Sequence, residues 1–430
     1  MNLVRQVKIK FNKSYQFIFF FLASLAVILF IYVLPALTKP VEISVLIQAL
    51  ESAQLQPLVT EFNQKHPDIK LEIIEAPNAS NQVEDLYTSS FLLGESPYDL
   101  VYMDIVWTPK FAAADWLLPL EDRVSDSELE NFLDGDVAGG SYNNSLYRMP
   151  FRSDAGMLYY RSDLLAKAGK NPPETFSELI ATAREIQTET DVNWGFLWQG
   201  KQYEGLAAFF VEILEGYGGF WVDPESLEVG LDRQNAIEAI EFLRSTIAEN
   251  VSPRGVTTYI EPDTHRLFIS GESVFMRNWP YVYSLASAPD SPIRGKFEIK
   301  PMVRAPGYNS GACLGGWGFG ISKTTKHPDA AWEVIEFFTS KASQKKYVLS
   351  TGYVPSRKSL FNDPEIVAKY AHYPELLNIV EQSALRPPIA QYSQASDILQ
   401  RYLSAALTDT MTSEAAMQAA AAETRRLLAR

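Results

Sequence analysis

A run of 21 residues without a charged side chain, Phe17–Leu37, lies near the start of the chain. The 16 positions before it contain no acidic residue and four basic ones: Arg5, Lys8, Lys10 and Lys13. About 20 apolar residues cross a bilayer as a helix, and a basic flank stays on the cytoplasmic side. The sequence therefore predicts a cytoplasmic basic segment at residues 1–16 and one N-terminal transmembrane helix at residues 17–37, with the remaining chain outside the cytoplasm.

This apolar run has two interpretations, an uncleaved signal anchor or a cleaved signal sequence. It is longer than the roughly 7–15 apolar residues usual in secretory signals, and Pro35–Thr38 is a poor match to a cleavage site between small residues. These features favour the anchor, while cleavage and secretion stay open. The chain has no cysteine near the run, so lipid attachment there is excluded.

Composition limits what the exported part can be. The 430 residues include 47% hydrophobic ones, enough for a substantial core, and 38 Lys and Arg against 52 Asp and Glu. Single cores stop growing at about 250–300 residues, so two or three domain-sized units are expected. The formal charge of −14 argues against a nucleic-acid partner, because duplex binding relies on Lys and Arg.

The sequence contains few residues that could form a disulfide, a metal site or a catalytic centre. Cys313 is the lone cysteine, which allows no internal disulfide and no cysteine metal site. The four histidines are not paired at ligand spacing: His66, His265, His327 and His372. No Walker loop, G-x-S-x-G elbow or H-E-x-x-H motif occurs. We therefore expect no metal, no cofactor and no catalytic residues.

Strand-like and helix-like segments alternate after residue 40. Val41–Ile47, Ile69–Ile74 and Asp99–Met103 are typical of strands, with helix-like Leu55–Gln64 and Val83–Leu92 between them. This βαβαβ order predicts a parallel sheet covered by helices on both faces.

A second α/β region follows, and the chain ends in helices. The expected strands are Met157–Arg161, Val192–Trp198 and Ser273–Met276, and the expected helices include Glu204–Gly216 and Gln234–Ile247. Thr175 and Glu178 have the spacing of a capping box that opens another helix. From His327 onward the pattern is nearly all helical, with Pro328 at a first helical position. The sequence thus predicts an α/β fold of two lobes with a helical C-terminal part.

Aromatic residues stand beside carboxylates at the ends of several expected strands: Asp104 with Trp107, Asp154, Trp279 with Tyr281, and Trp317. A sugar presents apolar C–H faces and rows of hydroxyls, which suit flat aromatic rings and acceptors that take two donors each. Each residue also has an ordinary structural interpretation. The aromatics suit a core, Asp104 suits a helix N-cap and Asp154 suits a turn. The residues alone indicate a polar and aromatic cleft.

Ten segments spread over the exported length carry a resemblance to a known family: Asp99–Asp104, Trp116–Leu120, Pro150–Phe151, Asp154–Leu164, Pro172–Leu179, Trp194–Leu206, Arg277–Tyr281, Leu314–Trp317, Gly320–Lys323 and Arg386–Pro387. Together they resemble family 1 of the extracellular solute-binding proteins of ABC transporters, in particular its trehalose/maltose-binding type. Each segment alone is a weak signal, and the set is specific.

The resemblance implies a two-lobed, type II-like periplasmic-binding-protein fold. Residues 41–150 plus about 302–355 would form lobe 1, and residues 151–301 plus about 356–430 would form lobe 2. It implies a monomeric, non-enzymatic receptor at the periplasmic or extracytoplasmic face of the membrane. Its ligand would be a disaccharide or glucoside osmolyte, such as trehalose, sucrose, maltose or glucosylglycerol, delivered to the permease subunits of an ABC importer.

The resemblance also implies a set of ligand contacts. Glu51 and Asp104 would accept sugar hydroxyls from lobe 1, and Asp154 from lobe 2. Trp279 and Tyr281 would stack on and cap the ring. The opposite wall and a cationic donor would come from Gly315, Gly316, Trp317 and Arg386.

Two departures from the trehalose type concern cationic side chains. Arg152 stands where that type has a tyrosine, and it joins the candidate binding residues. An arginine expected between Ala76 and Leu86 is missing, with Val83 and Glu84 near its place. One cationic donor is lost and another is gained, so the identity of the sugar does not transfer.

Two other functions stay open at this point. A secreted, membrane-anchored glycoside hydrolase also combines paired carboxylates with aromatic residues. A membrane-tethered sugar sensor would bind ligand without serving a permease. The resemblance over the whole exported length favours the receptor.

Overall fold

The computed structural model describes residues 21, 22, 24, 39–94 and 96–429. The predicted cytoplasmic segment (1–16) and nearly all of the predicted transmembrane helix (17–37) lie outside these residues, so both remain predictions. Among the residues that the structure describes, no helix is long and apolar enough to cross a membrane.

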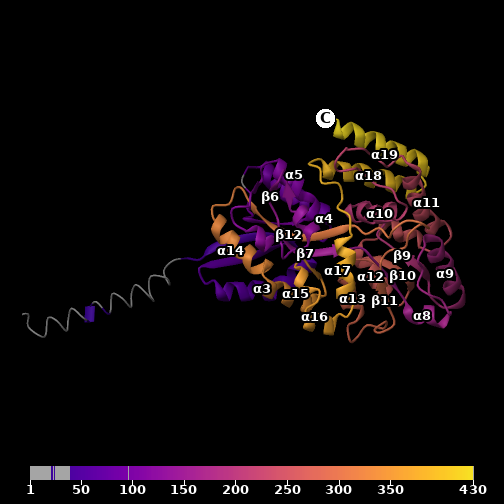
Figure 1. The fold of residues 1–430 in the computed structure, drawn as a ribbon, viewed down its shortest axis with the longest axis horizontal. Coiled ribbons are helices and arrows are strands. Elements are labelled where there is room, and N and C mark those ends of the chain that lie inside the picture. Colours follow the sequence, from indigo (N-terminus) through magenta and orange to yellow (C-terminus); the bar gives the residue numbers. More distant parts are fainter. Residues whose placement is uncertain (1–20, 23, 25–38, 95, 430) are drawn as a thin grey trace, which may run out of the picture.

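One half of the molecule is built on a seven-stranded sheet (Figure 1). The strand order is β13-β7-β12-β3-β1-β2, and β4 pairs with β12. The strands are β1 (Val41–Gln48), β2 (Ile69–Ala76), β3 (Leu100–Asp104), β4 (Leu117–Leu118), β7 (Met149–Ala155), β12 (Leu314–Ser322) and β13 (Val354–Pro355). Strands β1, β2 and β3 pair in parallel, as the βαβαβ order predicts.

The sheet also contains antiparallel strands, which the sequence did not predict. Strand β12 runs antiparallel to both β3 and β7, and β13 runs antiparallel to β7. These strands reach the sheet from distant parts of the chain, after it has built the other half of the molecule. A hydrophobic pattern is local in sequence and does not specify such distant pairing.

Helices and short elements surround this first sheet. They are α3 (Ala49–Lys65), α4 (Ser80–Leu92), η2 (Ile105–Trp107), α5 (Thr108–Ala113), α6 (Asp126–Leu129), α7 (Asp134–Ala138), α14 (Pro328–Thr339) and α15 (Lys341–Thr351), with the hairpin β5 (Ser141–Tyr142) and β6 (Ser145–Leu146). Pro328 is the first residue of α14, as predicted. Apolar side chains of α3 and α4, such as Leu55, Phe62 and Tyr87, are almost fully buried in the core.

The other half is built on a four-stranded sheet with the order β11-β8-β10-β9. Its strands are β8 (Met157–Tyr160), β9 (Trp194–Leu197), β10 (Ser273–Asn278) and β11 (Glu298–Lys300). Its helices are α8 (Ser162–Lys167), α9 (Phe176–Glu189), α10 (Glu204–Gly216), α11 (Gln234–Ala248), η3 (Arg254–Thr258), α12 (Glu261–Ile269) and α13 (Val282–Ala286). The predicted capping box of α9 is confirmed, because Thr175 Oγ1 accepts from Glu178 N and Glu178 accepts from Thr175 N.

The chain ends in helices, as predicted. They are η4 (Lys358–Leu360), α16 (Pro364–Lys369), α17 (Tyr373–Glu381), α18 (Tyr392–Leu407) and α19 (Ser413–Leu428). Helices α18 and α19 pack against each other and against α10 and α11 of the second half (Figure 1). Helix α17 instead packs against β7 of the first sheet.

A single residue, Gly156, separates β7 of the first sheet from β8 of the second. A side chain at this position would overlap the carboxylate of Glu212, which forms a fully buried ion pair with Arg277. Glycine is therefore required at this crossing. The sequence placed the start of lobe 2 at residue 151, but β7 pairs in the first sheet as far as Ala155. We propose Gly156 as the boundary.

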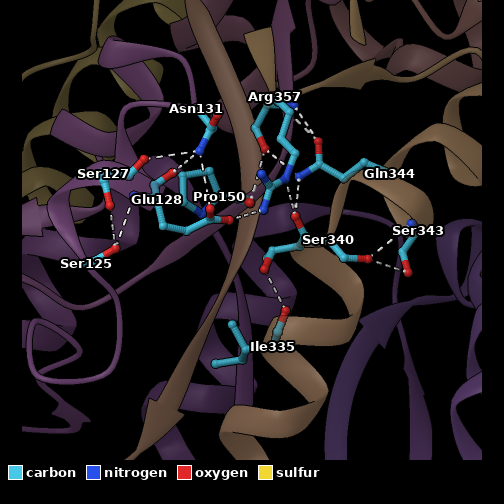
Figure 2. A network of polar contacts seen from close by, with 12 residues as sticks. Ser125, Ser127, Glu128, Asn131, Pro150, Ile335, Ser340, Ser343, Gln344 and Arg357 are labelled. Carbon is cyan, nitrogen blue, oxygen red and sulfur yellow. Dashed lines mark hydrogen bonds and ion pairs between the residues drawn. The ribbon is translucent and has the colours of Figure 1, made fainter. Parts of the chain in front are cut away.

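Residues just after β13 are fixed to the first half of the molecule (Figure 2). Gln344 Oε1 accepts from the backbone nitrogens of Ser356 and Arg357 at 3.1 and 3.2 Å. Arg357 Nε donates to Thr339 O at 2.6 Å, and its guanidinium pairs with Glu128. The sequence assigned residues 356 onward to lobe 2. We propose instead that lobe 1 continues through this segment.

Candidate functional site

A cleft between the two lobes contains all ten residues that the resemblance implied. It has a volume of about 890 Å³, including its open mouth. The ten lining residues are Glu51, Asp104, Arg152, Asp154, Trp279, Tyr281, Gly315, Gly316, Trp317 and Arg386. Nine of them have buried side chains or backbones, and Trp279 is half-buried.

Strand register brings the central residues together. Trp317 of β12 pairs with Asp104 of β3 on one side and with Arg152 of β7 on the other. Gly315 pairs with Asp154. Three strands that are far apart in sequence therefore place their polar and aromatic side chains at one edge of the first sheet.

Glu51 and Arg152 form a buried ion pair in which the carboxylate is fully engaged. Arg152 Nε and Nη2 donate to the two Glu51 oxygens at 2.8 and 3.0 Å. Tyr102 and Tyr347 donate their hydroxyls to Glu51 Oε1 at 2.5 and 2.9 Å. A carboxylate has about four acceptor sites. Glu51 therefore serves to hold Arg152 and has little capacity left for a ligand.

Burial disfavours a charge on Arg152, but its acidic neighbours outweigh this effect. Glu51, Tyr102 and Asp154 together raise the pKa of Arg152 well above its usual value. Its guanidinium lies 4.4 Å from the ring centroid of Tyr353. The arginine that replaces the expected tyrosine is thus a fixed cation inside the cleft.

Asp154 keeps one oxygen for a new partner. Its Oδ2 accepts from Arg152, whereas Oδ1 is buried without a hydrogen bond to any described residue. Burial raises the pKa of Asp154 to about 7, against the opposing effect of Arg152. The residue lies within β7, so the turn interpretation is wrong.

Asp104 and Arg386 meet across the cleft. Asp104 Oδ1 accepts from Arg386 Nη2 at 3.0 Å and caps η2 by accepting from Val106 N at 3.3 Å. Asp104 therefore caps η2 and also lines the cleft, while its contact with a ligand stays a prediction. Arg386 Nη1 donates to Glu204 Oε1 at 2.5 Å, while its Nε has no partner among the described residues.

Aromatic rings form the opposite side of the cleft. Trp279 Nε1 donates to Glu261 Oε1 at 3.2 Å, and the guanidinium of Arg277 lies 4.0 Å from the Trp279 ring centroid. These contacts fix the orientation of the indole. Tyr281 stacks on Tyr353 with ring centroids 5.2 Å apart.

The two wall glycines lie in tight surroundings, and Gly316 also has a backbone conformation that favours glycine. A Cβ on Gly315 would lie 3.3 Å from the Trp279 ring. Gly316 has φ +142°, and a Cβ there would lie 2.8 Å from the Arg152 carbonyl oxygen. These positions let the wall approach Trp279 and Arg152 closely.

Thirteen further residues line the cleft, among them Tyr203, Glu204, Glu261 and Tyr353. Tyr203 and Glu204 lie in Trp194–Leu206, whose resemblance was noted without a role. No sequence signal marked Glu261 or Tyr353. Their place in the cleft follows from the packing of the two halves.

The cleft carries an excess of negative charge. Five carboxylates line it, those of Glu51, Asp104, Asp154, Glu204 and Glu261, against the guanidinium groups of Arg152 and Arg386. Such a surface disfavours an anionic ligand. Within the described residues, no three His, Cys, Asp or Glu side chains are arranged to hold a metal ion.

Two α/β lobes enclosing a polar and aromatic cleft define a two-lobed binding protein. Residues 48–345 match the family described as bacterial extracellular solute-binding protein. The chain belongs to this family of substrate-binding proteins and is not an enzyme.

Individual relatives agree with this assignment. A probable ABC transporter-binding protein of Deinococcus radiodurans is 29% identical, over 79% of this chain and 82% of that protein. A maltotriose-binding protein of Pyrococcus abyssi is 26% identical, over 74% of this chain and 67% of that protein. The structure of maltose-bound T. maritima MalE3 is similar with a TM-score of 0.86 and 38% identity, covering 90% of this chain and all of that one.

Proposed function

We propose that this protein is the sugar-binding component of an ABC importer and encloses a neutral disaccharide or glucoside between its lobes. The observation that carries the proposal is the pair of carboxylates facing the cleft opposite the fixed Trp279 ring. Asp154 Oδ1 and Asp104 Oδ2 accept no hydrogen bond from a described residue. Sugar hydroxyls supply the donors that these oxygens lack, and the ring offers a face for sugar C–H groups.

The hydrogen bonds and ring contacts that the cleft offers contribute enough free energy for micromolar sugar binding. A hydrogen bond to a charged group contributes about 1.5–3 kcal/mol. Several such bonds, together with ring stacking and the burial of apolar sugar surface, support micromolar binding, about −8 kcal/mol, after association costs. Contacts to both lobes favour the closed form, by which a permease distinguishes loaded from empty receptor.

The proposed ligand class draws on the relatives. The T. maritima protein holds maltose, the Pyrococcus protein is named for maltotriose, and a Pseudomonas aeruginosa relative for mannitol. All three ligands are neutral and rich in hydroxyls, as the acidic cleft requires. Trehalose, sucrose and glucosylglycerol belong to the same chemical class.

The place of action and the partners are part of the proposal. The family is extracellular, and the uncharged run 17–37 suits an anchor that holds the protein at the outer face of the membrane. We propose permease subunits of an importer as the partner and a monomer as the working form.

Titration calorimetry tests the proposal. The full-length protein, in a detergent without a sugar head group, is titrated with maltose, trehalose, sucrose and glucosylglycerol, and the mixtures are assayed for released glucose. We expect micromolar binding of at least one sugar without turnover. Absence of binding to all four contradicts the proposed ligand class.

A further inference from the structure

Glu84 lies near the position where an arginine was expected, and its carboxylate has partners on two sides. It belongs to α4 and is 8% exposed. Lys110 Nζ donates to Glu84 Oε1 at 2.8 Å, and Ser393 Oγ donates to the same oxygen. Ser393 lies on α18, which packs against α10 and α11 of the second lobe. The bond between Glu84 and Ser393 therefore joins the two lobes.

Asn81, about one turn earlier on α4, makes a second contact of this kind. Its Oδ1 accepts from the backbone nitrogen of Glu204 at 2.9 Å. Glu204 is the first residue of α10, where backbone N–H groups have no partner within the helix. One helix of lobe 1 thus meets both α10 and α18.

The third contact is the bond between Asp104 and Arg386. Arg386 is held on the second lobe through Glu204, because Tyr392 and Ser396 of α18 also donate to that carboxylate. From this support Arg386 Nη2 reaches Asp104 of the first lobe. Every donor and acceptor in the three contacts is a protein group.

We infer that these contacts form an interlobe latch, defined as Glu84–Ser393, Asn81–Glu204 N and Asp104–Arg386. Glu84, Asn81 and Ser393 are its positioning residues, because none of them lines the cleft. The latch stabilises the closed form without help from the ligand. The apparent affinity for sugar increases with the fraction of the protein that is in the binding-competent, closed form. Residues outside the cleft that stabilise the closed form therefore raise the affinity.

Distances between spin labels in the ligand-free full-length protein test the latch. Gln64→Cys in α3 and Lys167→Cys in α8 place labels at exposed sites in different lobes. The native Cys313 is fully buried, and burial raises the pKa of its thiol to about 12, so it does not compete for the label. We expect the closed-form distance to be present in ligand-free wild-type protein.

Ser393→Ala and Asn81→Ala are each expected to raise the open fraction at least twofold. Each is also expected to speed sugar dissociation about two- to tenfold, with maltose restoring the short distance. Ser404→Ala is the matched control on α18, because its hydroxyl bonds to no other described residue. The latch is overturned if the ligand-free wild-type protein shows only the open-form distance. It is also overturned if Ser393→Ala and Asn81→Ala have the same open fraction as Ser404→Ala. The latch measurement requires no ligand, so its failure is distinct from failure of the calorimetry.

Discussion

Asp136 is a buried acidic residue, outside the predicted ligand contacts, that makes stability depend on pH. It is fully buried behind Gly316, accepts from Ser153 Oγ at 3.0 Å through Oδ1, and has no partner for Oδ2 among the described residues. Burial raises its pKa to about 7, with neighbouring Arg148 opposing the rise. The carboxyl is therefore protonated in the folded protein over a pH range in which it is ionised in the unfolded chain.

Asp136→Asn is expected to flatten the pH dependence of stability. The folded protein holds this extra proton between about pH 4 and 7, so the free energy of unfolding falls as pH rises through that window. Each pKa unit corresponds to about 1.4 kcal/mol. Calorimetric Tm values from pH 4.5 to 8 should fall less for the variant than for the wild type. An unchanged slope would show that Asp136 does not titrate there, and Asp191→Asn at an exposed site serves as control.

Asp104→Ala and Trp279→Ala should each weaken sugar binding at least tenfold while leaving the fold intact. The first removes an acceptor and frees Arg386, and the second removes the ring face. Calorimetry with the best ligand gives the affinity, and circular dichroism checks folding. Trp332→Ala on α14, away from the cleft, is the matched control. An unchanged affinity removes the corresponding residue from the site.

Sequence and structure agree on which residues gather in the cleft and differ on what some of them do. Glu51 was expected to accept sugar hydroxyls, but three protein side chains already occupy its oxygens. Tyr102 and Tyr347 carry no local pattern that pairs them with Glu51. Whether hydrogen bonds within the protein already occupy a carboxylate depends on residues far away in the sequence. This can therefore be seen only in the three-dimensional structure.

At the scale of elements, the strands and helices that local patterns predicted are present, whereas strands such as β7 and β12 were not predicted. Repeated hydrophobic spacing, a capping box and a proline at N1 are signals contained within a few residues. Strand β12 is different, because it contains four glycines that weaken its strand signal. A Cβ on Gly318 would overlap the Met149 carbonyl oxygen, so packing within the sheet requires glycine at this position. The same glycine makes the segment hard to predict as a strand.

Arg357→Ala is expected to lower the free energy of unfolding by about 1–3 kcal/mol, since it removes a hydrogen bond, an ion pair and a ring contact. Arg357 pairs with Glu128 (Figure 2) and donates to Thr339 O. Its guanidinium lies 4.3 Å from the Phe132 ring centroid. Urea unfolding measures the change. The exposed pair Arg184–Glu249 gives the control Arg184→Ala, with an expected loss below about 1 kcal/mol. Equal losses for both variants would contradict a special role of Arg357.

At the scale of the whole molecule, the two-lobed fold was predicted from the resemblance, and the lobe boundaries that we propose differ from those expected at residues 151 and 356. Composition does not change at residue 151 or 356. The boundaries depend on which sheet a strand joins and on long-range bonds such as those of Ser356. Pairing of this kind has no signature in a short window of sequence.

The Gly156 crossing gives the two ends of the cleft different mechanical roles. Asp154 lies two residues from the crossing, so a rotation of the lobes about it carries this carboxylate through a short arc. Asn81 and Ser393, on the helices that meet away from the crossing, travel a longer arc. The cleft near Asp154 therefore changes little between the open and the closed form, whereas the latch contacts break and form again.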